Sequence, residues 1–157
     1  MIVVSDTTAI TSLLAIDGTD ILRQVFGEVS IPSAVLRELR VVHSEVPDFF
    51  QTREVVDGDA VRQLTAVGLG AGEAEAIILA EELAADFLLI DESEGRAIAR
   101  RRGLPIIGLL GVLLRAKREG LVPAIAPTLE ALMTLGEFWV SEQVRNQVLA
   151  DAGESEA

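Results

Sequence analysis

Apolar residues fall into short continuous runs that are separated by longer segments with helical spacing. The run at residues 2–4 is β-branched and does not alternate with polar residues, which predicts a strand buried on both faces. Further short strands are expected at residues 28–31, 53–56, 87–90 and 105–107. Helices are expected at residues 9–15, 20–25, 33–40, 60–66, 73–86, 92–102, 109–119, 127–135 and 141–149. Residues 41–51 have a mixed pattern, and this region gives the weakest signal in the chain.

The alternation of strands and helices predicts an α/β protein whose crossovers are right-handed and whose sheet is parallel at least in its core. We expect a three-layer α/β/α sandwich around a central, mostly parallel β-sheet of four to five strands. A length of 157 residues suits one domain, placed at residues 1–150, and the acidic stretch 151–157 is expected to be a disordered tail. Half of the residues are hydrophobic, which excludes an intrinsically disordered chain.

Composition narrows the possible chemistry. The absence of cysteine excludes disulfides, zinc–thiolate sites and thiol nucleophiles, and a single histidine, His43, argues against imidazole chemistry. No apolar run approaches the roughly 18 residues of a membrane span, and the first residues do not resemble a signal peptide, so a cytoplasmic protein without membrane association is expected. The net charge of −12 argues against a polyanionic partner, although arginines cluster at residues 96–102 and 115–118.

Two aspartates stand at the ends of predicted strands. Asp6 follows the first strand, and Asp91 follows the strand at residues 87–90. Ligand sites in open parallel sheets form outside the carboxyl ends of the strands, so the two carboxylates can reach one ion if these strands are neighbours. The alternative for each aspartate is a helix N-cap. Carboxylate oxygens are hard ligands that suit Mg²⁺ or Mn²⁺.

Two glutamates on predicted helices could join the aspartates. Glu38 lies near the end of the helix at 33–40, where it could equally belong to an exposed face, and Glu73 lies in the first turn of the helix at 73–86, where it could simply complement the helix dipole. The glycine-rich segment 68–72 before Glu73 lacks the ending of a P-loop, so it is interpreted as a turn and not as a phosphate loop.

Four segments in this order resemble PIN domains of the branch related to VapC-like toxins (DUF3368-like), up to about residue 149. They are VVSDTTAI, VSIPSAVLREL, GLGAGEAEAIILAEELAADFLLIDESEGRAIA and GLPIIGLLGVLLRAKREGLV. The resemblance implies an endoribonuclease that depends on Mg²⁺ or Mn²⁺. It also implies that the catalytic and metal-binding residues are Asp6, Glu38, Glu73 and Asp91.

The resemblance suggests supporting residues as well. Many PIN domains carry aspartate at the third acidic position, whereas this chain has Glu73, with Glu75 close by as a rival ligand. The hydroxyl that the family places near the first acid maps onto Thr7 or Thr8, and Thr8 is favoured. Arg96 could contact a phosphate of the substrate or pair with Glu92 four residues earlier, and the pairing is favoured.

The implied function is metal-assisted hydrolysis of RNA phosphodiester bonds by the toxin of a type II toxin–antitoxin pair. Such a toxin has a small cognate antitoxin protein as its partner and commonly forms a homodimer. The apolar helix at 109–117 could bury a dimer face, although an ordinary core stripe is favoured. The alternative function is a catalytically weak or inactive PIN-like module that acts by binding its partner. Phosphatase and receiver domains fit less well, because Asp6 has no acidic neighbour.

Overall fold

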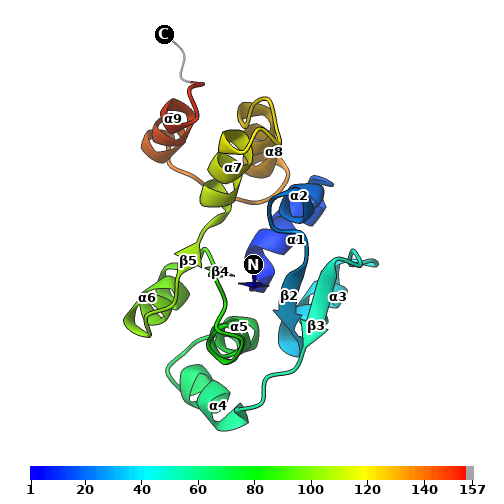
Figure 1. Ribbon diagram of the computed structural model, residues 1–157, viewed down its shortest axis with the longest axis vertical. Coiled ribbons are helices and arrows are strands. Elements are labelled where there is room, and N and C mark those ends of the chain that lie inside the picture. Colours follow the sequence, from blue (N-terminus) through cyan, green and yellow to red (C-terminus); the bar gives the residue numbers. More distant parts are fainter. Residues whose placement is uncertain (155–157) are drawn as a thin grey trace.

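The computed structural model describes residues 1–154, which contain one five-stranded, all-parallel sheet (Figure 1). The strand order is β3-β2-β1-β4-β5. The strands are β1 (Val3–Ser5), β2 (Val29–Pro32), β3 (Phe50–Arg53), β4 (Phe87–Leu89) and β5 (Ile106–Ile107). The predicted α/β fold with a parallel sheet of four to five strands is therefore confirmed.

Helices connect the strands and continue after the last one. They are α1 (Thr7–Ala15), α2 (Asp20–Phe26), α3 (Ser33–Val42), α4 (Gly58–Ala66), α5 (Ala71–Glu82), α6 (Ser93–Arg101), α7 (Leu109–Arg118), α8 (Ala126–Thr134) and α9 (Glu142–Asp151). In Figure 1, α4, α5 and α6 lie below the strands, and α1, α2 and α7 lie above them. These two helical layers with the sheet between them make the sandwich that the sequence predicts.

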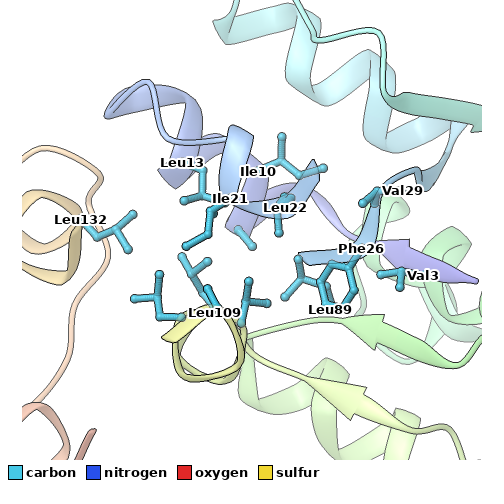
Figure 2. Packing of buried hydrophobic residues seen from close by; sticks show 14 of the residues in the cluster. Val3, Ile10, Leu13, Ile21, Leu22, Phe26, Val29, Leu89, Leu109 and Leu132 are labelled. Atoms are coloured by element: carbon cyan, nitrogen blue, oxygen red, sulfur yellow. The ribbon is translucent and has the colours of Figure 1, made fainter. Parts of the chain in front are cut away.

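Each face of the sheet has its own apolar cluster. On one face, Ile10 and Leu13 of α1 converge with Leu22 of α2 on Leu109 of α7, as Figure 2 shows. On the other face, α5 packs its alanines and isoleucines against β1 and β4. Helix α5 is buried almost all round because α3, α4 and α6 also pack on it, which explains why small apolar residues fill its sequence.

The sheet has its topological switch point between β1 and β4. From β1 the chain moves to β2 and then β3 on one side, and it returns through α5 to β4 and β5 on the other. Val3, Val4 and Ser5 pair with Phe87, Leu88 and Leu89 in parallel register. Ligands of open α/β sheets bind outside the carboxyl ends of the strands at such a point, which here is the end that follows Ser5 and Leu89.

The third strand lies at a different position from the one that the sequence predicted. The third strand was expected at residues 53–56 and is found at Phe50–Arg53, in register with Val29–Pro32. Phe50 decides the register because its ring is buried in the core, whereas the next three residues are exposed at the sheet edge. Asp57 then caps α4 by accepting the N–H of Ala60.

The C-terminal stretch also differs from the expected disordered tail. Asp151 is the last residue of α9, and the side chain of Glu154 accepts hydrogen bonds from Lys117, Ile125 and Ala126. Residues 155–157 of the expected tail lie outside the described part. Across residues 1–154, no helix is both long and apolar enough to cross a membrane.

Candidate active site at the carboxyl edge of the sheet

Asp6 and Asp91 follow the two central strands at the switch point. The backbone N–H of Asp6 donates to the carbonyl of Leu89 at 3.1 Å, which continues the β1–β4 ladder beyond the last paired residues. The two aspartates are 85 positions apart in the sequence (91 − 6) and lie on adjacent strands. The structure thus places them together at the edge where the sequence predicted a site.

The carboxylate of Asp6 is buried and unsatisfied. Asp6 is 1% exposed, and neither of its carboxylate oxygens has a hydrogen-bond partner among the described residues. It occupies the N-cap position of α1, and its side chain makes no capping hydrogen bond, although the backbone N–H of Thr8 lies near enough to lower its pKa. Burial raises the pKa of Asp6 well above its ordinary value, and the negative charges of Asp91 and Glu73 raise this pKa further.

Glu73 shares this environment from the first turn of α5. Its Oε2 atom is buried and has no hydrogen-bond partner in residues 1–154. Burial and then the negative charge of Glu92 raise the pKa of Glu73 to about 6. A buried polar atom without a partner is unfavourable, so the site favours a proton or a cation between these carboxylates.

Asp91 has a partner that the sequence did not indicate. Its two carboxylate oxygens lie 3.1 and 3.2 Å from the N–H of Leu109 in the first turn of α7. Burial raises the pKa of Asp91, although the hydrogen bond from Leu109 and the charge of Arg96 work in the opposite direction. Asp91 therefore has the capping role that was considered for it, but toward α7 and not toward α6, which follows it.

Two threonines after β1 hold two glutamates at the rim of the site. The hydroxyl of Thr7 donates to Glu38 at 3.2 Å, and the hydroxyl of Thr8 donates to Glu92 at 3.0 Å. Glu38 is exposed on α3. Glu92 was considered in the sequence only as a partner for Arg96, although an acid directly after a strand-end aspartate was the signal that could have found it.

Glu75 and Arg96 make contacts other than those that the sequence suggested. The carboxylate of Glu75 accepts the N–H of Ala34 at the start of α3 and lies 3.8 Å from Arg37. Arg96 does not pair with Glu92 within the described chain, because its Nη1 donates to the carbonyl of Ile90 at 2.9 Å and its guanidinium lies beside Asp91. The favoured Arg96–Glu92 pairing is therefore not what the structure shows.

Three glycines make room for three of the carboxylates. A Cβ atom on Gly95 would lie 2.6 Å from Oε2 of Glu73, and one on Gly108 would lie 2.7 Å from Oδ1 of Asp91. A Cβ atom on Gly72 would overlap the carboxylate of Glu38. Real Cβ atoms do not approach so closely, so each glycine leaves a position that its acid occupies.

The donor chemistry of the site fits a divalent cation. Asp6 and Glu73 present carboxylate oxygens that are buried without partners, and Asp91 and Glu92 add negative charge beside them. Hard oxygen donors of this kind suit Mg²⁺ or Mn²⁺. As the side chains stand, no three acidic or histidine residues in 1–154 are already grouped at metal-binding distances. Metal binding at this site would therefore involve rotation of side chains.

Fold and site together define an α/β protein with an acidic centre at its topological switch point. A family model of PIN domains (DUF3368) matches residues 2–154, and the chain belongs to this family. PIN domains are generally nucleases and typically use divalent metals. None of the curated proteins matches the chain.

Proposed function

We propose that the protein is a Mg²⁺- or Mn²⁺-dependent endoribonuclease that hydrolyses RNA phosphodiester bonds at the Asp6 centre. The observation that carries the proposal is a set of buried carboxylate oxygens without partners at the switch point, namely both oxygens of Asp6 and Oε2 of Glu73. Bare carboxylates would repel a phosphodiester, so a cation is required before a polyanion can approach them. Membership of the PIN-domain family supports a nuclease.

Asp6, Glu73 and Asp91 would hold the cation, with Glu38 or Glu92 completing the set from the rim. When bound, such an ion lowers the pKa of a water molecule and stabilises negative charge on the phosphate. Asp6 is fixed by the β1–β4 ladder, and Asp91 is oriented by the N–H of Leu109. Glu38 and Glu92 accept the hydroxyls of Thr7 and Thr8, so the one that turns inward would exchange this hydrogen bond for the cation.

Cleavage assays with matched acid variants test this function. The parent protein should cut RNA in Mg²⁺ or Mn²⁺ and stop when EDTA is added. Asp91→Asn should cut RNA at least about a hundredfold more slowly than the parent. The fold should be kept, because the amide oxygen of the asparagine can still accept the N–H of Leu109. Asp48→Asn is the control, because Asp48 is an exposed acid in the loop before β3. Equal cutting by the parent and Asp91→Asn would refute the site.

The resemblance to VapC-like toxins extends the proposal to a type II toxin with a cognate antitoxin protein and a homodimer. The apolar face of α7 is not free for a dimer, because Leu109, Val112 and Leu113 are buried in the core. Other large apolar side chains are exposed, among them Val41 at the end of α3 and Trp139 after α8, which are 85% and 83% exposed. Growth arrest on induced expression, relieved by the product of an adjacent small reading frame, is the expected result.

A protein-binding module without catalysis is the second candidate, and the same exposed side chains favour it. Light scattering of the parent and a Trp139→Ser variant tests for self-association through this residue. A protein that binds its partner with unchanged affinity in EDTA, and that does not cut RNA in Mg²⁺, would favour the module over the enzyme.

A further inference from the structure

A groove between α4 and α6 borders the acidic centre. Its volume is about 550 Å³, which is within the range of sites that take small ligands. The buried part of its lining, which forms the floor, is apolar and consists of Leu64 and Leu69, each 6% exposed. Leu69 belongs to the turn that leads into α5, four residues before Glu73 in the chain.

One face of α6 forms a wall of the groove with opposite charges at its two ends. Glu94, Ala97, Ile98 and Arg101 all line it, and their spacing of three, four and seven residues places them on one side of the helix. Glu94 and Arg101 are two helical turns apart, roughly 10 Å along the axis. The Glu94 end adjoins the acidic centre, because the next residue of α6, Gly95, lies directly against the carboxylate of Glu73.

The arginines at the far end of the groove are not equivalent. Arg102 pairs with Glu81 through contacts of 2.7 and 3.1 Å, so its charge is already largely compensated. Arg101 also lines the groove, and in residues 1–154 no acidic side chain forms an ion pair with it. Its guanidinium is therefore available to an anion from outside the protein.

We propose that this groove binds one unpaired nucleotide of the RNA substrate next to the bond that is cleaved, with its base on the apolar floor and its phosphate at Arg101. The inference rests on the proposed ribonuclease function. Glu94 orients the nucleotide, because its carboxylate repels a phosphate and accepts N–H groups of a base edge. A base stacked in a duplex does not present its faces to such a groove, so the substrate is single-stranded.

Filling the groove tests the site of binding. Binding of a labelled single-stranded oligonucleotide in Mg²⁺ is measured by fluorescence anisotropy in an Asp6→Asn background, in which cleavage is expected to be slow. Ala97→Trp should weaken binding by about tenfold. The control is Ala66→Trp, which places the same side chain on an exposed position of α4 that does not line the groove. Equal affinities for the two variants, or no measurable binding by either and by their background, would overturn the proposal.

A second pair of variants tests the phosphate contact without adding bulk. Arg101→Ala should reduce the slope of log affinity against log salt by about 0.7, the value for one phosphate contact to a single strand. Arg100→Ala removes the same charge from the neighbouring exposed position of α6, which does not line the groove, and should change the slope less. Equal changes would show a general charge effect, and equal affinity for a duplex of the same sequence would contradict a single-stranded substrate.

Cleavage assays on the parent protein, in which Asp6 is intact, separate this inference from the function on which it rests. If the parent cuts single-stranded RNA and Ala97→Trp cuts it at the same rate and affinity, the groove assignment fails while the ribonuclease stands. If the binding differences appear but the parent does not cut RNA, the ribonuclease assignment fails and the groove remains a site for RNA.

Discussion

Asp6 and Glu154 both have side chains largely covered by the fold, but only the carboxylate of Glu154 is surrounded by hydrogen-bond donors. Glu154 accepts hydrogen bonds from Lys117 and from the backbone N–H groups of Ile125 and Ala126 at the start of α8. Burial alone would raise its pKa, yet these bonds prevail and lower it. Asp6 has no hydrogen-bond partner among the described residues, and burial with three neighbouring acids raises its pKa. A carboxylate that the fold satisfies stabilises the fold, whereas one left unsatisfied indicates a ligand.

The largest effect that this comparison predicts comes from neutralising Asp6. Asp6→Asn should reduce cleavage by about 10²- to 10³-fold, because it removes a charge that the cation needs. The same change should leave the thermal unfolding temperature of the metal-free protein unchanged or raise it, since it removes an unpaired buried charge. Cleavage rates and calorimetry on the same samples check both parts. A large loss of stability would show that Asp6 is a structural residue like Glu154.

Neutralising Glu154 should produce the reverse pattern. Glu154→Gln keeps the shape of the side chain but removes its charge, and should lower the free energy of unfolding by about 1–2 kcal/mol. Cleavage by the folded protein should not change, because Glu154 anchors the C-terminal segment to α7 and α8, away from the acidic centre. Urea unfolding of this variant beside Glu45→Gln, an exposed loop substitution, measures the difference.

A smaller effect is expected when a carboxylate is displaced without being removed. Gly95→Ala adds a methyl group that must push away Oε2 of Glu73 or the side chain of Ile90, and should reduce cleavage by about tenfold. Gly58→Ala is the matched control, since a Cβ atom there meets only Arg62 at an ordinary 3.4 Å. Unchanged cleavage by Gly95→Ala would mean that Glu73 can move freely or is not needed.

The sequence predicted the framework of the site better than its details. Strand-end placement was enough to bring Asp6 and Asp91 together, because parallel strands end at a common edge. The sequence did not predict the directions in which side chains on the helices point. Glu73 and Glu75 are two residues apart on α5 and point to different neighbours, and only the packing of α3 against α5 takes Glu75 to Ala34.

The other features that the sequence did not predict depend on contacts between distant segments. Gly95 and Gly108 matter because they face Glu73 and Asp91, which the local sequence of neither glycine reveals. Glu154 looked like part of a charged tail, since its three donors come from residues 28 to 37 positions earlier in the chain. The position of β3 followed the burial of Phe50 and not a local turn signal.

The comparison also predicts opposite responses of the two acids to pH. A carboxyl group whose pKa is raised by folding holds its proton more tightly in the folded state, so its stabilising contribution is greatest below the unfolded value and is lost as pH rises through the folded value. For Glu73 this range is from 4.5 to about 6. Glu154, with a lowered pKa, stabilises the fold above 4.5 and loses this contribution as pH falls below that value.

Thermal unfolding in EDTA measures these responses. Between pH 4.5 and 6.5, the unfolding temperature of Glu73→Gln should fall less with rising pH than that of the parent. Below pH 4.5, Glu154→Gln should lose less stability than the parent as pH falls. Parallel curves for the parent and Glu73→Gln over the upper range would contradict the raised pKa of Glu73.

The smallest effect concerns Glu75, the rival of Glu73 for the third acidic position. Glu75→Gln should leave cleavage within about twofold of the parent, because its carboxylate caps α3 at Ala34 and faces Arg37, not the acidic centre. Gln can still accept the N–H of Ala34, so only the favourable charge at the start of the helix is lost, which is worth under about 1 kcal/mol. Glu73→Gln in the same assay should lose activity strongly. If Glu75→Gln loses cleavage and Glu73→Gln does not, then Glu75 is the functional acid, and α5 must rotate or α3 must release it before the site can form.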